Sequence, residues 1–353
     1  MDVASRVPPA GARPPVLDCA LAMEALEEAP ATARIAEETG FRGLWANDTQ
    51  HNPFVALAIA AQATTRLELG TGIAVAFARS PMITAQTAWD LSRLSGGRFL
   101  LGLGTQVRAH IERRFGMPWD PPVPKLREYI QALRAIWRTW QDGAPLRVSG
   151  VHYNINLMGP FFNPGPNAHP RIPVLIAGVN EGLCRLAGEA ADGFIVHPMH
   201  SLPYLKEFVV PHIAEGLARA GRQRGEVAIV VPVMLAAGDT PDELRAAVDR
   251  ARARIAFYGS TPTYRVVLEL LGHGELADRL RRMVAERRMN EIASQVPDAV
   301  LDAIVIRGSY EEVGRELRDR YTGLADRVFS YWPFTVAERA QWARMAEAFH
   351  TAG

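Results

Sequence analysis

The chain has 353 residues, which fits one elaborated α/β barrel domain better than two separate domains. Lys and Arg together number 39 against 38 Asp and Glu, so no excess positive charge favours nucleic acid as a partner. Two cysteines are too few for a disulfide framework, and no apolar run reaches the roughly 18 residues that a membrane helix requires. We therefore expect a soluble cytoplasmic protein without a membrane partner, with a flexible segment over residues 1–15 and a single domain over residues 16–353.

Short apolar segments alternate with longer helical patterns along the chain, and this alternation is typical of βαβ units in a parallel sheet. The predicted strands are residues 16–22, 43–46, 67–75, 98–103, 173–177, 193–197, 227–236 and 327–331. The predicted helices that separate or follow them include residues 31–39, 53–64, 81–94, 181–190, 241–257, 309–322 and 336–349. Eight parallel strands with intervening helices predict an α/β protein of the (β/α)8 TIM-barrel class.

Two insertions interrupt the alternation, one after the fourth strand and one between the seventh and eighth strands. The first is predicted to hold a helix over residues 125–141 and a hairpin around residues 147–157. The second holds helical patterns between residues 264 and 293. Residues 303–306 are as β-like as residues 327–331. We place the eighth strand at 327–331, because one more helix follows it, and assign 303–306 to the insertion.

Two consecutive helices are expected to form a homodimer interface. The helix over residues 53–64 has almost no polar face, which indicates burial on both sides. The helix over residues 81–94 starts from Ser80, a favourable N-cap residue, with Pro81 in its first turn. We expect both helices to pack against a second copy of the chain.

Glycines end three of the predicted strands, at the edge where α/β barrels bind their ligands. The segments are Gly70-Thr71-Gly72-Ile73, Gly102-Leu103-Gly104-Thr105-Gln106 and Gly178-Val179-Asn180. Glycine lets a backbone pass close to a flat ligand. The first two segments lack the third glycine of a dinucleotide fingerprint, so each is weak support for a Rossmann site.

The third glycine segment is a candidate phosphate site. A strand that turns through Gly178 directly into a helix aims free backbone N–H groups and the positive end of the helix dipole at one point. An anion would bind there, at Gly178, Val179 and Asn180, without any lysine. An ordinary tight βα turn is the alternative interpretation.

Four histidines lie beyond the predicted strand ends. His51 and His110 are candidate acid–base residues, because imidazole exchanges a proton near neutral pH; loop histidines facing solvent are the alternative. His197 and His200 have a spacing that metals use, but no carboxylate or thiolate lies near them in the sequence. We therefore predict no metal site.

Two further sets of residues have a functional and a structural interpretation. Trp45, Phe77, Met117 and Trp119 either roof an apolar substrate pocket or belong to the core. Five arginines between residues 279 and 288 either contact an acidic cofactor tail or form one solvated helix face, and the second is the commoner case.

The glycine segments, together with Ala191-Asp192-Gly193-Phe194, resemble the luciferase-like family of (β/α)8 enzymes, and the resemblance extends over residues 16 to about 333. They are most similar to its deazaflavin-dependent branch. The resemblance implies hydride transfer between C5 of coenzyme F420 and a small organic substrate. It also implies that Gly72-Ile73 forms a bulge with a non-prolyl cis peptide behind the central ring of the cofactor, with Thr105 and Gln106 in the same site.

Further roles follow from the same resemblance. Residues 178–180 would hold the cofactor phosphate, and His51 or Asp48 would handle the proton. The resemblance also makes His197 and His200 substrate residues by their positions, whereas Trp45 and Phe77 are expected substrate residues because of their aromatic side chains.

The chain also departs from the sugar-phosphate-oxidising members of the branch. These carry an Asp-His pair after the second strand and a Glu after the fourth, whereas Thr49 follows Asp48 here and Val107 or Arg108 stands in place of the Glu. His197 and His200 occupy the positions of their substrate-binding Thr and Lys. The sequence therefore predicts a different substrate.

Two alternatives remain open. The first is a two-component monooxygenase that uses reduced FMN and dioxygen on an apolar substrate. The second is a non-catalytic flavin-binding protein, which the missing Glu after the fourth strand favours.

Overall fold

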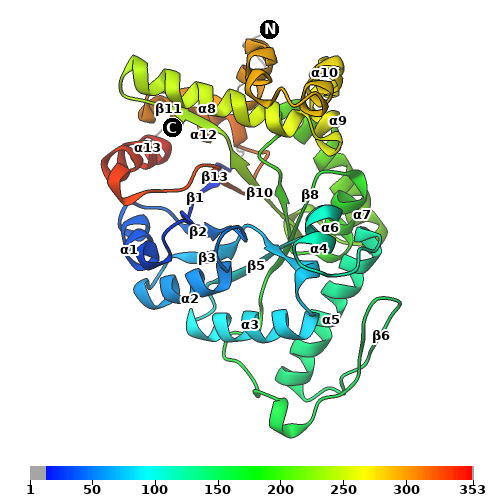
Figure 1. Ribbon diagram of the computed structural model, residues 1–353. Coiled ribbons are helices and arrows are strands. Elements are labelled where there is room, and N and C mark those ends of the chain that lie inside the picture. The colour runs from blue at the N-terminus through cyan, green and yellow to red at the C-terminus, as the bar shows by residue number, and fades with distance from the viewer. Residues whose placement is uncertain (1–12, 352–353) are drawn as a thin grey trace.

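Eight parallel strands close into a barrel with helices around it (Figure 1), in a computed structural model that describes residues 13–351. The strands are β1 (Val16–Ala20), β2 (Gly43–Ala46), β3 (Glu68–Thr71), β5 (Phe99–Gly104), β8 (Val174–Gly178), β9 (Gly193–Val196), β10 (Ala228–Val233) and β13 (Arg327–Ser330). The barrel closes because β3 pairs with β5, and β13 pairs with both β1 and β10. The predicted (β/α)8 TIM barrel is confirmed. Residues 1–12 of the predicted flexible segment lie outside the described residues.

The helices around the barrel follow the predicted ones closely. They are α1 (Ala29–Glu38), α2 (Pro53–Ala63), α3 (Pro81–Leu94), α5 (Pro122–Asp142), α6 (Glu181–Ala190), α7 (Val210–Ala220), α8 (Pro241–Gly259), α12 (Tyr310–Tyr321) and α13 (Arg339–Thr351). The start of α3 is as expected, because Ser80 Oγ accepts a hydrogen bond from the Ile83 N–H at 3.2 Å. The short α4 (Arg108–Arg113) and α7 are not among the predicted helices. Pro211 lies at the start of α7, directly after the π-helical segment Tyr204–Val209, and it removes one backbone donor at this junction.

The eighth strand is residues 327–330, as predicted, and not the competing segment. Residues 303 and 304 end the helix α11 (Asp298–Ile304), and β12 (Ile306–Gly308) pairs with β11 (Leu235–Ala237) in a separate two-stranded sheet. The predicted seventh strand divides at Met234, because β10 belongs to the barrel and β11 to this second sheet. The second insertion also contains α9 (Arg265–Leu270) and α10 (Gly274–Ala285).

The first insertion has the predicted helix and hairpin. The hairpin consists of β6 (Val148–Ser149) and β7 (Asn154–Ile155), which pair antiparallel.

Within residues 13–351, no helix combines the length and apolar character that crossing a membrane requires.

Side chains fill the interior of the barrel. Trp45 stacks on Phe329 with ring centroids 5.7 Å apart, and both are almost fully buried. A Cβ at Gly70 would lie 2.4 Å from Cε3 of Trp45, so the glycine makes room for the indole. The carboxyl ends of the strands are therefore the part of the barrel where a ligand can bind.

Candidate active site

An ion pair joins the segment after β2 to the segment after β3. Asp48 Oδ2 accepts hydrogen bonds from the Val75 N–H at 3.0 Å and from Arg79 Nη1 at 2.6 Å. The guanidinium of Arg79 also lies over the ring of Phe54, 5.3 Å from its centroid. The Asp48 side chain is 7% exposed, so this carboxylate fixes β4 (Ala74–Val75) beside the segment after β2.

The Gly72–Ile73 peptide interrupts the third strand between β3 and β4, and it is cis, as the resemblance implies. Both residues are half-buried, whereas the residues on either side are buried. The Gly72 N–H donates to the Ala46 carbonyl at 2.8 Å, and the Ile73 carbonyl accepts from the Asp48 N–H at 3.1 Å. Within the described part of the chain, the Gly72 carbonyl and the Ile73 N–H have no protein partner. An unpaired donor and acceptor at the rim fit contact with a polar ring system.

The glycines at two other strand ends make room for protein side chains. A Cβ at Gly104 would lie 2.6 Å from Cδ1 of Ile73. A Cβ at Gly178 would lie 2.5 Å from the Leu183 Cβ. At Gly72 the nearest atom would be 3.3 Å away, so this glycine leaves more space around its backbone.

Thr105 and Gln106 follow β5, next to the Gly72–Ile73 peptide. Thr105 is 9% exposed, and Gln106 has a φ of +58°, which is uncommon for a residue with a side chain. The Oε1 of Gln106 accepts a hydrogen bond from the Val107 N–H at 3.0 Å. The left-handed residue turns the chain out of β5 and into α4 at the rim.

The helix α4 brings His110 beside the segment after β2. Arg114 Nη2, at the end of α4, donates to the Thr49 carbonyl at 2.8 Å, and His110 lies one turn earlier on the same face. His51 and His110 are both exposed. The two acid–base candidates therefore occupy adjacent segments of the rim, with access to solvent.

Residues 178–180 turn from β8 into α6. Asn180 is the N-cap, since its Oδ1 accepts from the Leu183 N–H at 3.0 Å. The remaining N–H groups of the first turn have no partner within the helix, which is the arrangement that binds phosphate. Glu181 stands in that first turn and opposes an anion, but its carboxylate is paired with Arg185 at 3.1 Å.

His200 is enclosed by protein. It is 1% exposed, its Nε2 lies 2.8 Å from the Tyr321 hydroxyl, and its Nδ1 lies 3.0 Å from the His197 carbonyl. Burial lowers the pKa of His200 to about 4, so it is neutral at pH 7. With both nitrogens engaged, His200 supports the chain after β9 and does not face a ligand.

His197 is half-buried at the rim. Its Nδ1 accepts from the Met199 N–H at 3.1 Å, which places the ring proton on Nε2. The ring stacks on Tyr264 with centroids 4.2 Å apart, and burial lowers the pKa of His197 to about 3. His197 is therefore a neutral donor.

Aromatic residues surround His197 and form a set that we call the aromatic wall: His197, Tyr258, Tyr264, Tyr331 and Trp332. The ring centroids of His197 and Tyr258 are 4.6 Å apart, and the hydroxyls of Tyr258 and Tyr331 lie 2.8 Å apart. Our sequence prediction does not include the four residues besides His197. Tyr331 and Trp332 directly follow β13, which is a usable signal, whereas nothing in the sequence marks Tyr258 and Tyr264.

Trp45 and Phe77, two expected substrate residues, are 1% and 2% exposed. Trp45 lies inside the barrel, where its Nε1 donates to Asp18 Oδ2 at 2.8 Å. The Phe77 ring contacts Trp119 edge-on, and Lys125 Nζ lies 4.9 Å from its centroid. These contacts favour the core interpretation of both residues.

The arginine-rich segment lies on the exposed side of α10 and beyond it. Leu276 and Leu280 are on the buried face of α10, and Arg288 pairs with Glu286 and Glu291. This arrangement favours a solvated helix face.

Across residues 13–351, no group of three or more His, Cys, Asp or Glu side chains is placed to hold a metal ion.

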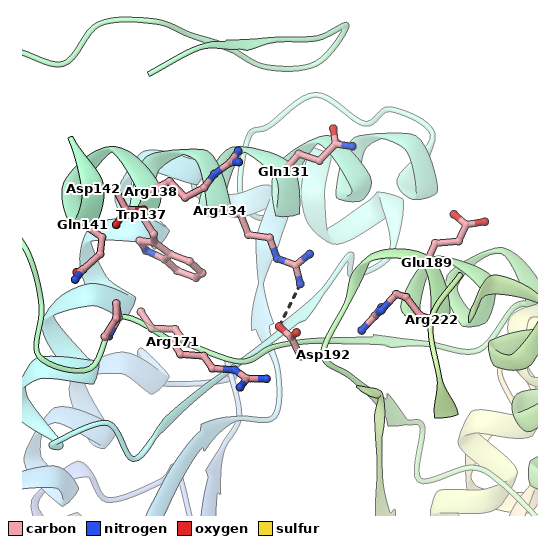
Figure 2. Close-up of a pocket in the computed structure, with 12 residues that line it drawn as sticks. Gln131, Arg134, Trp137, Arg138, Gln141, Asp142, Arg171, Glu189, Asp192 and Arg222 are labelled. Atoms are coloured by element: carbon pink, nitrogen blue, oxygen red, sulfur yellow. Dashed lines mark hydrogen bonds and ion pairs between the residues drawn. The ribbon is translucent and has the colours of Figure 1, made fainter. Parts of the chain in front are cut away.

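A cavity of about 790 Å³ lies between α5 and the chain that leads into β8 and β9 (Figure 2). Ile172 precedes β8 and Asp192 precedes β9, so the cavity is at the amino-terminal end of the barrel. Arg134 reaches across it to Asp192, with an N···O distance of 3.2 Å. The cavity is therefore separate from the rim at the carboxyl ends, where the candidate active site lies.

Comparison with known proteins gives relatives over nearly the whole chain. The model of a family described as luciferase-like monooxygenase matches residues 5–327. An uncharacterized protein of Mycobacterium tuberculosis is 45% identical over 318 residues, which cover 90% of this chain and 93% of that protein. Another protein of Mycobacterium tuberculosis, provisionally named a coenzyme F420-dependent oxidoreductase, is 27% identical over 80% of this chain and 84% of its own.

Solved structures share the fold. The coenzyme F420-dependent tetrahydromethanopterin reductase from Methanopyrus kandleri superposes with a TM-score of 0.76 at 22% identity, covering 95% of this chain and 97% of that one. An EDTA monooxygenase from Chelativorans has a TM-score of 0.73 at 16% identity, covering 97% and 95%.

Proposed function

The chain belongs to the luciferase-like monooxygenase family and is an oxidoreductase, and we propose that it uses coenzyme F420 to transfer a hydride to or from a small organic substrate. The observation that carries the proposal is the 27% identical relative named for this cofactor, which matches over 80% of the chain. The likeness to the F420-dependent reductase structure supports it at the level of the fold. Two buried free cysteines, Cys19 and Cys184, suit a reducing cytoplasm.

The rim offers contacts for a flat, phosphorylated cofactor. Bound F420 would supply a two-electron carrier whose C5 accepts or donates a hydride. The unpaired Gly72 carbonyl and Ile73 N–H would contact its ring system, with Thr105 and Gln106 beside them. The first turn of α6, after residues 178–180, would bind its phosphate.

In this proposal, His51 or His110 performs acid–base catalysis. His51 and His110 are exposed and lie on adjacent segments, so either can exchange a proton with solvent. Asp48 acts as a positioning residue, because its carboxylate is bound to Arg79 and the Val75 N–H. His197 donates a hydrogen bond from Nε2 to the substrate.

Identification of the cofactor tests the proposal. Purified protein would be titrated separately with F420 and FMN, and any chromophore released on denaturation would be identified by mass spectrometry. We expect tight binding of F420 and weak binding of FMN. Preference for FMN would support the monooxygenase alternative, which the likeness to the EDTA monooxygenase fold favours.

Variants separate catalysis from binding. With F420 and a panel of small alcohols and ketones, with and without a carboxylate group, we expect His51→Gln to slow hydride transfer by about 100-fold without changing F420 affinity. The control is His169→Gln, because His169 is an exposed histidine whose carbonyl contacts α3. The non-catalytic alternative would be favoured if the wild-type protein binds the cofactor but turns over no member of the panel. In that case His51→Gln should bind the cofactor as the wild type does and be equally inactive.

A further inference from the structure

Arg254 stands against the aromatic wall. It lies on α8, and its Cζ is 5.8 Å from the ring centroid of Tyr258, 5.7 Å from that of Tyr331 and 5.8 Å from that of Trp332. The side chains of Arg254 and of all three rings are half-buried. Because Tyr331 and Trp332 directly follow β13, this guanidinium lies at the carboxyl rim of the barrel, on the same side as His197.

Within residues 13–351, no carboxylate neutralises Arg254. Two other arginines of α8 are paired: Arg252 contacts Asp298 at 2.5 Å, and Arg245 contacts Asp242. Aromatic faces attract a guanidinium and fix its orientation, but they leave its N–H groups without acceptors. The aromatic rings therefore fix the guanidinium of Arg254 in place, while its N–H groups remain available to bind a ligand.

The wall also has an unused hydroxyl proton. The Tyr258 and Tyr331 hydroxyls share one hydrogen bond of 2.8 Å, in which one hydroxyl donates and the other accepts. The second proton has no acceptor among the described residues. Burial, and then the neighbouring hydroxyl of Tyr331, raise the pKa of Tyr258, so the phenol keeps this proton. His197 adds an N–H on Nε2.

Among the described residues, Arg254 and the aromatic wall together thus provide one cation and several neutral donors without a paired carboxylate. An oxyanion is the ligand group that satisfies such a set, because a carboxylate accepts from a guanidinium and from hydroxyls together. The flat faces of Tyr264 and Trp332 favour an apolar or aromatic body attached to it.

We propose that this enzyme acts on organic acids, and that Arg254 binds the substrate carboxylate while the aromatic wall packs against the rest of the molecule. This assignment rests on the proposed function for the reaction itself, but the binding of the acid does not depend on which cofactor is used. Arg254 acts as a specificity-determining residue and takes no part in hydride or proton transfer.

Ligand-observed fluorine NMR tests the assignment without cofactor or turnover. The probes are 4-fluorophenylacetate and its neutral counterpart, 4-fluorophenylacetamide, at pH 7.5. We expect the wild-type protein to bind the carboxylate at least about 10-fold more tightly than the amide, since a charge-assisted hydrogen bond contributes about that factor. Arg254→Gln should abolish the preference, and Arg254→Lys should retain part of it, because a lysine keeps the charge but not the planar fork.

Arg250→Gln is the matched control, because Arg250 is an exposed arginine one turn away on α8. This variant should keep the wild-type preference. Equal or absent binding of the two probes to wild type, or a preserved preference in Arg254→Gln, would overturn the assignment.

The acidic tail of F420 is the other possible source of a carboxylate. F420 affinity is therefore measured in Arg254→Gln as well, and we expect it to stay within about twofold of wild type. A loss of F420 affinity with an unchanged probe preference would assign the guanidinium to the cofactor and overturn the substrate role. If the cofactor proves to be FMN, the proposed function fails while the probe result stands.

Discussion

Asp18 is a fully buried carboxylate inside the barrel, and its partners satisfy both of its oxygens. Arg327 Nε and Nη2 donate to Oδ2 and Oδ1 at 2.6 and 2.7 Å, and Trp45 Nε1 donates to Oδ2 at 2.8 Å. Arg327 also contacts Glu68 at 2.5 Å. Burial alone would lower the pKa of Arg327. The carboxylates of Asp18 and Glu68 have the larger, opposite effect, so the pKa is raised. This pair joins β1 to β13 at the closure of the barrel.

We expect Asp18→Asn to lower the free energy of unfolding by about 3 kcal/mol, because it leaves the Arg327 charge buried with one carboxylate in place of two. Urea denaturation followed by tryptophan fluorescence measures the change. Arg42→Gln is the control, since it removes the exposed Arg42–Glu68 contact of 2.9 Å and should cost less than about 1 kcal/mol. Similar losses in the two variants would contradict a special contribution from the buried pair.

Residue positions at the candidate site could be predicted better than residue environments. The sequence places His197 and His200 after the sixth strand, and both lie there. Their three-residue spacing does not reveal that His200 is enclosed beside Tyr321, 121 positions later, whereas His197 is only half-buried. Gly104 was likewise placed at a strand end, but the Ile73 side chain that fills its space comes from a different strand. Burial depends on such distant partners, which a local pattern does not contain.

At the scale of elements, α6 and α7 cross at two glycines. A Cβ at Gly188 would lie 2.2 Å from the Ile213 carbonyl oxygen, and a Cβ at Gly216 would lie 2.0 Å from the Arg185 carbonyl oxygen. These backbone oxygens cannot move away from an added Cβ as the end of a flexible side chain could. The close packing of these two helices therefore requires glycine at both positions.

We expect Gly216→Ala to destabilise the protein by about 2 kcal/mol or more, because the added methyl group must push α6 and α7 apart. Thermal and urea unfolding measure the effect. The matched control is Gly225→Ala, where an added Cβ would meet no atom within 4 Å and the change should stay within about 0.5 kcal/mol. Equal stability of the two variants would show that the helices separate at no cost.

Element boundaries were predictable where capping and periodicity agree. Pro81 begins α3 and residues 181–190 form α6 as predicted, since each start carries a capping residue, Ser80 or Asn180. The predicted seventh strand, in contrast, is one apolar run that serves two sheets, β10 in the barrel and β11 outside it. Its division at Met234 depends on the partner strand β12, about 70 positions later, so periodicity cannot reveal it.

At the scale of the whole molecule, the arginines of the barrel interior and of the carboxyl rim differ in the groups that hold them. Hydrogen bonds join the interior pair of Asp18 and Arg327, whereas Arg254 at the carboxyl rim is held by aromatic faces. The aromatic wall brings together His197 after β9, Tyr258 on α8 and Tyr331 after β13, which follow one another at intervals of 61 and 73 positions in the sequence. Closure of the barrel brings these residues together. The (β/α)8 class and the place of His197 could be predicted from the sequence, but its contacts with Tyr258 and Tyr264 could not.

We also expect two copies of the chain to pair through α2 and α3, which lie side by side in Figure 1. The helix α2 has no charged residue, yet Val55 on α2 is 46% exposed and Ile83 on α3 is 53% exposed. Burying these side chains favours association, whereas a carboxylate in the interface would oppose it. Light scattering should therefore give a dimer for wild type and a monomer for the Val55→Glu, Ile83→Glu double variant. Val151→Glu is the control, since Val151 is 91% exposed between β6 and β7, and it should remain dimeric. A monomeric wild type at working concentration would refute this interface.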